Sequence, residues 1–125
     1  MQNMNSVTWF EIPTINLTRA QEFYERVFNV KLQEIEGLPG IKMVMFPGAH
    51  EYAGAMGVLV HSETEVPSQQ GTLVYFHCQD VSEELTRVEE NKGKILLPKT
   101  AIGDNGYMAH FCDTEGNRIA LHSMQ

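Results

Sequence analysis

The first half of the chain alternates between short extended segments and one amphipathic helix. Apolar residues at spacings of three and four predict a helix over residues 17–28. Thr18 and Gln21 form a capping box at its start, and Asn29 ends it. Alternating apolar and polar residues predict strands near residues 7–12, 31–36, 41–46 and 55–61.

The second half shows the same order of a strand, a helix and three strands. Asp80 is placed to cap a helix that ends before Gly93. Pro98 is expected to break the strand that follows this helix. The strands are predicted near residues 72–78, 94–97, 107–111 and 117–122.

The two halves also correspond at three separate places, which indicates an internal duplication. Residues 16–17 match residues 80–81, residues 43–46 match 108–111, and residues 58–62 match 119–123. The last match pairs Leu59 with Ala120. We therefore expect one α+β domain over residues 1–125, built from a first module at about 5–62 and a second at about 71–124. Each module is marginal in size by itself, so a shared sheet is expected.

Three segments carry a resemblance to a known family. They are the strand at residues 9–13, the helix at 19–28 with its Phe23-Tyr24 pair, and residues 111–121, where an acidic turn and Gly116-Asn117 lead into the last strand. In these the chain resembles the vicinal oxygen chelate superfamily, which holds glyoxalase I, bleomycin-resistance proteins and extradiol dioxygenases. With residues 96–100 and 102–103 it looks closest to the subgroup of predicted enzymes related to lactoylglutathione lyase.

The resemblance has consequences for architecture and assembly. It implies two βαβββ modules that form an eight-stranded cupped mixed sheet with the helices outside. It also implies a cavity for a small-molecule ligand between the modules, and frequently a homodimer.

Metal-binding members of the family place a His or Glu ligand on the first and the last strand of each module. The resemblance and the repeat carry these positions to Trp9, Leu59, Leu73 and Ala120. None of these side chains has a nitrogen or oxygen donor suited to a divalent ion. We therefore expect no metal in the family's usual place, and this counts against glyoxalase I activity and extradiol ring cleavage.

A ring of polar side chains lies two positions along from those four, on the face that strand alternation turns to the cavity: Glu11, His61, Tyr75 and His122. Three interpretations remain open for this ring. Glu11, His61 and His122 could hold a displaced divalent metal. Alternatively, Glu11 or His122 acts as a base without metal, while Tyr75 donates a hydrogen bond to an enolate-like oxygen. In the third interpretation the ring is merely a hydrated rim.

Other side chains are candidates for contact with a ligand. Trp9, the single tryptophan, either stacks on a planar ligand or fills the core. His77 shares the face of Tyr75 and can reach the cavity, although a structural role is the alternative. The predicted substrate contacts are therefore Trp9, His61 and His77.

Composition and charge limit the kinds of molecule that the protein is expected to bind. Nine Lys and Arg residues against 16 Asp and Glu residues give a net charge of -7, which disfavours nucleic acid and anionic membranes. Because the inferred cavity positions are mostly neutral or His, the surplus acid is expected on the outside. No apolar run approaches the ~20 residues of a membrane span, and residues 1–5 lack leader features, so a cytoplasmic location is expected. Cys78 and Cys112 are expected to be buried free thiols.

Two functions follow from these observations. The first is a metal-independent lyase or isomerase for a small oxygenated metabolite, with Glu11, Tyr75 and His122 as catalytic residues. The alternative is a non-catalytic protein that binds or sequesters a small molecule, as the bleomycin-resistance relatives do.

Overall fold

Two helices and eight strands follow one another in the predicted order in the computed structural model, which describes residues 5–37 and 39–125. The first module contains β1 (Trp9–Pro13), α1 (Leu17–Phe28), β2 (Gln33–Glu36), β3 (Lys42–Met45) and β4 (Met56–His61). The second contains β5 (Tyr75–His77), α2 (Val81–Glu90), β6 (Lys94–Ala101), a short 3-10 helix (Gly103–Asn105), β7 (Tyr107–Cys112) and β8 (Arg118–Ser123). The start of the chain, on which the expectation of no leader rests, lies largely outside the described residues.

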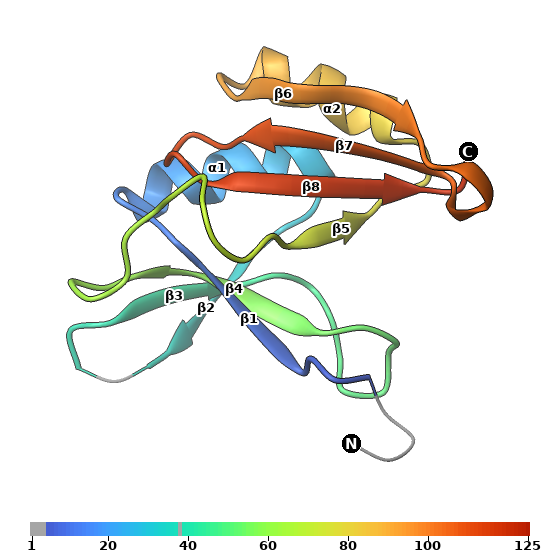
Figure 1. The fold of residues 1–125 in the computed structure, drawn as a ribbon. Helices are drawn as coiled ribbons and strands as arrows, with labels where there is room; N and C mark the ends of the chain where they lie inside the picture. Colours follow the sequence, from blue (N-terminus) through green and yellow to red (C-terminus); the bar gives the residue numbers. More distant parts are fainter. Residues whose placement is uncertain (1–4, 38) are drawn as a thin grey trace.

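The strands form two four-stranded mixed sheets that share one topology (Figure 1). Their orders are β1-β4-β3-β2 and β5-β8-β7-β6, and the first strand of each module pairs in parallel with the last. The duplication and the α+β class are thereby confirmed. The eight strands are divided between two hydrogen-bonded sheets, however, with β1 and β5 as their inner edges.

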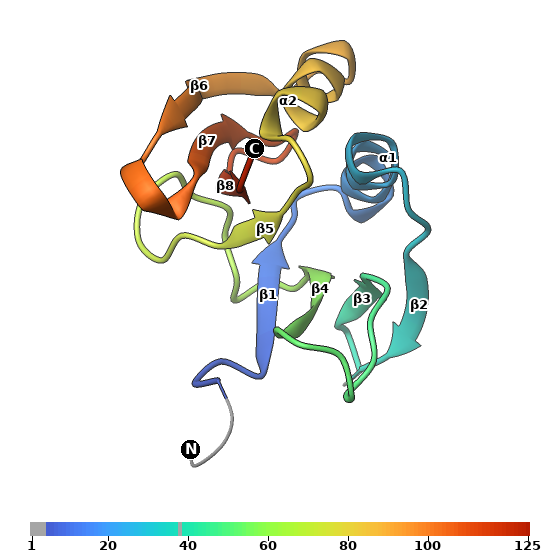
Figure 2. The ribbon, with the colours of Figure 1, turned by 90° about the vertical axis from the view of Figure 1, so that its right-hand side faces the viewer.

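The helices join the two modules. Helix α1 packs against β3 and β4, α2 packs against β6, β7 and β8, and the helices contact each other, as Figure 2 shows. One hydrophobic core therefore draws on both modules, and its large buried members include Ile12, Tyr24, Leu59, Phe111 and Leu121. Among the described residues no helix is both long and apolar enough to cross a membrane.

The caps of α1 correct one prediction. Asn16, not Thr18, is the N-cap: its backbone is extended (φ -129°, ψ 101°), and its side chain accepts a hydrogen bond from the backbone N–H of Arg19. Thr18 is already helical and cannot take that role. Asn29 ends the helix as predicted, in the left-handed conformation with φ 55°.

Strand β6 corrects a second prediction, because it continues through Pro98 to Ala101. Its pairing with β7 shifts register between Leu97 and Thr100. An edge strand with such an irregularity does not need the N–H that proline lacks.

Candidate ligand-binding site

Side chains of strand β1 alternate between the core and the opposite face of the strand. Phe10 and Ile12 point into the core, whereas Trp9 and Glu11 lie on the opposite face. Trp9 keeps 39% of its surface exposed, and its indole N–H donates a hydrogen bond of 3.4 Å to Oε2 of Glu11. Trp9 therefore does not fill the core.

A cavity of about 900 Å³ lies between the inner edge strands β1 and β5. It draws residues from both modules, as the resemblance implies. Four of the predicted site residues line it: Trp9, Glu11, Tyr75 and His77. The volume lies within the range of small-molecule sites.

The floor of the cavity is a cluster of aromatic rings that joins the modules. Phe76 of β5 packs against Phe10 of β1 with ring centroids 5.7 Å apart. The ring centroids of Phe28 and Phe46 lie 4.6 Å and 5.2 Å from that of Phe76. All four rings line the cavity, while Trp9 forms part of its wall.

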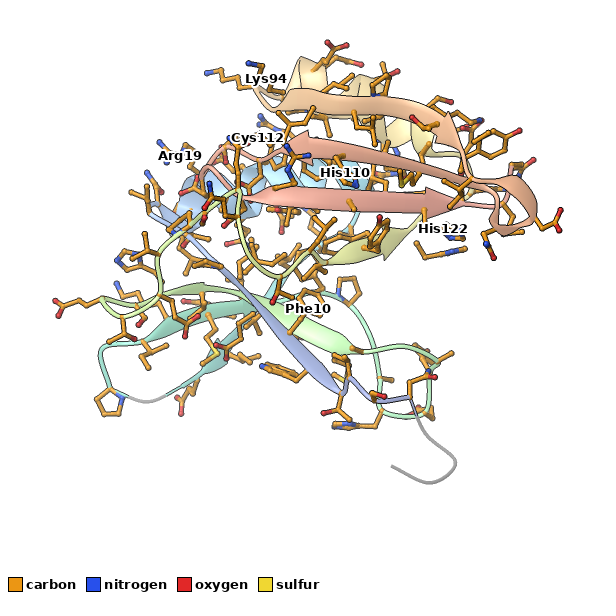
Figure 3. The ribbon with its side chains drawn as sticks, in the orientation of Figure 1. Phe10, Arg19, Lys94, His110, Cys112 and His122 are labelled. Carbon is orange, nitrogen blue, oxygen red and sulfur yellow. The ribbon has the colours of Figure 1, made fainter. Side chains whose placement is uncertain are left out.

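The predicted catalytic residues are only partly brought together. Tyr75 lines the cavity and is 48% exposed, but its hydroxyl donates to Sδ of Met108 at 3.6 Å. His122 shares the face of His77, its register partner, yet it is not among the lining residues. Its Nε2 lies 2.6 Å from the carbonyl oxygen of Asn105, in the short 3-10 helix before β7. Figure 3 shows His110 and His122 on the neighbouring strands β7 and β8, away from Phe10 on β1.

The prediction that His61 shares the face of Glu11 is wrong. Glu11 is the register partner of Val58, so Val58 and Val60 share its face, and Leu59 and His61 point the other way. Leu59 accordingly lies in the core, and Nδ1 of His61 lies 3.0 Å from the carbonyl oxygen of Thr14. In the structural repeat Ala120 therefore corresponds to Val58. The sequence match between β4 and β8, which paired Ala120 with Leu59, was displaced by one residue.

The residues present do not fit the metal that the family resemblance implies. With the register corrected, the four ligand positions hold Trp9, Val58, Leu73 and Ala120, which have no coordinating nitrogen or oxygen. Glu11, His61 and His122 do not converge on a common point either. Over residues 5–37 and 39–125, no group of three or more His, Cys, Asp or Glu side chains could hold a metal ion.

Glu65 and Glu84 are acidic residues of the site region that the sequence did not single out. Burial, and after it the neighbouring Glu11 carboxyl, raise the pKa of Glu65. Glu65 lies in the segment between the modules, where no periodic pattern marks it. Its proximity to Glu11 could be found only from the fold.

Glu84 of α2 also lines the cavity. Its side chain is 12% exposed; Oε2 accepts from Nη2 of Arg87 at 3.3 Å, whereas buried Oε1 has no hydrogen-bond partner. The sequence places Glu84 in the first turn of a helix, where an acid favours the helix dipole, and that role concealed its contact with the cavity.

Cys78 also lines the cavity, and both cysteines are free. Burial, followed by the neighbouring Glu84, raises the pKa of the Cys78 thiol to about 12, so the reactive thiolate is scarce. Cys78 is buried as predicted, while Cys112 is partly exposed.

Comparison with known proteins agrees with this architecture. The profile of the Glyoxalase/Bleomycin resistance protein/Dioxygenase superfamily matches residues 6–121. A glyoxylase-like domain-containing protein from Didymella fabae is 30% identical over 118 residues, which cover 92% of this chain and 91% of that protein.

Solved structures share the fold at lower identity. TnmS3, an antibiotic binding protein from Streptomyces sp. CB03234, superposes with a TM-score of 0.66 at 23% identity, covering 98% of both chains. Lactoylglutathione lyase from Agrobacterium tumefaciens gives 0.65 at 19% identity, covering 98% of this chain and 96% of that one. The E144Q mutant of glyoxalase I from Zea mays gives 0.72 at 20% identity; the match covers 94% of this chain but only 46% of the maize chain. The chain thus spans a little under half of the maize protein.

Proposed function

This chain belongs to the Glyoxalase/Bleomycin resistance protein/Dioxygenase superfamily, and on that premise we propose that it binds and sequesters a flat, largely apolar small molecule between β1 and β5. The observation that carries the proposal is the aromatic cavity of about 900 Å³. Its floor is the Phe76 cluster, and Trp9 and Tyr75 stand partly exposed in its walls. Such rings offer stacking surface to a planar ligand.

Two further observations favour binding over chemistry. The predicted catalytic trio is not assembled, because His122 contacts Asn105 and does not line the cavity. A structural neighbour, TnmS3, is itself described as an antibiotic binding protein. Both observations support sequestration.

The single tryptophan provides the test. Acridine, a neutral planar probe, is expected to quench Trp9 fluorescence in a saturable manner. Tyr75→Ala should weaken this binding roughly fivefold, because it removes a stacking wall worth about 1 kcal/mol. Tyr52→Ala is the matched control. Tyr52 is 66% exposed and adjacent in sequence to residues that line the cavity, but it does not line the cavity itself. Absence of saturable quenching, or equal losses in both variants, would refute the proposal.

Metal-independent proton transfer is the second candidate, and one observation favours it. Glu11 lines the cavity, and the pKa of the adjacent Glu65 is raised by burial and by Glu11, as suits an acid–base pair. Turnover of lactoylglutathione without added metal, abolished by Glu11→Gln, would favour this candidate. No turnover, together with intact acridine binding, favours sequestration.

Homodimer formation and a cytoplasmic location are part of the same proposal. The homodimer rests on the family resemblance.

A further inference from the structure

The charge of the cavity lining is one-sided. Two carboxylates, Glu11 and Glu84, are among its residues, together with His77, and no Lys or Arg is. Glu11 lies at the cavity as predicted, whereas the contact of Glu84 with the cavity was not expected.

Neither carboxylate is fully neutralised by the described part of the chain. Glu11 has no ion-pair partner there; its neighbours are the Trp9 indole and the Glu65 carboxyl. Glu84 forms an ion pair with Arg87 through one carboxylate oxygen, and its other carboxylate oxygen is buried without a hydrogen-bond partner. A buried acceptor with no donor is costly, and a ligand N–H would satisfy it.

The aromatic walls of the cavity also favour a positively charged ligand. The electron-rich faces of Trp9, Tyr75 and the phenylalanine floor attract organic cations as well as flat apolar surfaces. A positive charge is thus favoured by both kinds of lining group, whereas an anion is repelled by the carboxylates.

We infer that the ligand is an organic cation: a planar aromatic body carrying a protonated amine or amidine-like group, with its N–H groups directed to Glu11 or Glu84. This inference rests on the proposed binding function and adds the charge of the ligand to it. Carboxylates that face a cationic group form charge-assisted hydrogen bonds, which are stronger than neutral ones.

Three acridines of nearly equal shape separate charge from stacking. At neutral pH 9-aminoacridine is cationic, acridine is largely neutral and acridine-9-carboxylate carries an anionic group. Titrated against Trp9 fluorescence, 9-aminoacridine is expected to bind roughly tenfold more tightly than acridine, and acridine-9-carboxylate more weakly than both.

The variants assign the preference to the carboxylates. Glu11→Gln and Glu84→Gln should each reduce the ratio of 9-aminoacridine affinity to acridine affinity about threefold or more. Glu83→Gln is the matched control, because Glu83 is the exposed neighbour of Glu84 outside the lining. Glu11 is exposed on its strand, so Glu11→Gln is expected to fold even if Glu84→Gln does not, and a preference lost in Glu11→Gln alone supports the inference.

The outcomes distinguish the two proposals. Equal binding of all three probes overturns the cation inference and leaves the binding function intact. A preference that survives in both variants also overturns it, since the carboxylates would then not be its source. No binding of any probe overturns both proposals.

Discussion

Gly57 lies on β4 directly opposite Phe10 of β1, and a side chain at this position has no room. A Cβ atom there would lie 2.3 Å from the Phe10 ring. The ring is held in turn by Phe46 and Phe76, so it cannot simply swing aside. The floor of the cavity thus depends on the absence of a side chain in the neighbouring strand.

Gly57→Ala is therefore expected to destabilise the protein by about 1–3 kcal/mol, the usual cost of overpacking. It should also weaken acridine binding, because Phe10 is displaced. Urea unfolding and Trp9 fluorescence measure the two effects. The control is Gly48→Ala, where the new Cβ would meet Met56 at an ordinary 3.5 Å. A Gly57→Ala protein as stable as the control would show that the ring has freedom the structure does not display.

His61 shows where prediction of the site from sequence failed. Apolar residues at 58, 59 and 60 make β4 read as apolar on both faces, so nothing in the pattern fixes which residue faces the core. A displacement of one residue in the repeat then moved His61 to the wrong face. On β1 the prediction succeeded, since polar Glu11 alternates with apolar Phe10 and Ile12.

At the scale of elements, the turn before β8 fastens α1 to the second module. The Glu115 side chain is 0% exposed, and Oε1 accepts from the backbone N–H groups of Ile15 and Asn16 at the start of α1. Oε2 accepts from Nε of Arg19 at 2.8 Å. Burial by itself would raise the pKa of Glu115, but these hydrogen bonds outweigh it and lower the pKa. The acidic turn that carried the family resemblance is thus an anchor for a helix in the other module.

Glu115→Gln should cost about 2 kcal/mol at neutral pH, because charge-assisted hydrogen bonds are weakened. A carboxyl with a lowered pKa stabilises the fold above its unfolded pKa of about 4.3 and loses that contribution as pH falls through the folded pKa. The stability gap between the wild type and Glu115→Gln should therefore narrow below about pH 4.3. Urea unfolding over this pH range tests it.

The control for this titration is Glu22→Gln, on the exposed face of α1. It makes the same chemical change outside the anchor, and we expect only a small gap at any pH. A Glu115→Gln gap that stays constant as the pH falls would show that the ionised carboxylate is not what stabilises the anchor.

Elements were predictable where one local signal dominates. The bounds of α1 follow from its apolar spacing, and Asn29 supplies the left-handed residue that ends it. The prediction that Pro98 breaks its strand was wrong because an edge strand tolerates a proline only where its pairing partner does not need the missing N–H. The local sequence does not show that partner. The contact of Glu84 with the cavity was missed for a related reason: it arises only through the packing of distant segments, as does the proximity of Glu65 to Glu11.

At the scale of the whole molecule, duplication has produced halves that share one core. Tyr24 of the first module is fully buried, and its hydroxyl donates to Oδ2 of Asp113 in the second at 2.7 Å. The Phe23 ring packs 5.9 Å from Phe111, and the Phe76 cluster crosses the same boundary. Separating the modules would expose these surfaces in both.

Neither half is therefore expected to fold alone, although each contains a full set of βαβββ elements. Fragments spanning residues 5–66 and 67–125 are near the lower size limit for independent folding, and each loses its partner's share of the core. Each fragment should show no cooperative thermal transition by circular dichroism and poor dispersion in amide NMR spectra. Mixing them in equal amounts should restore both signals, because the shared core then re-forms. A cooperative transition in either fragment alone would mean that one module is stable without the other, and that the cavity forms by docking of preformed halves.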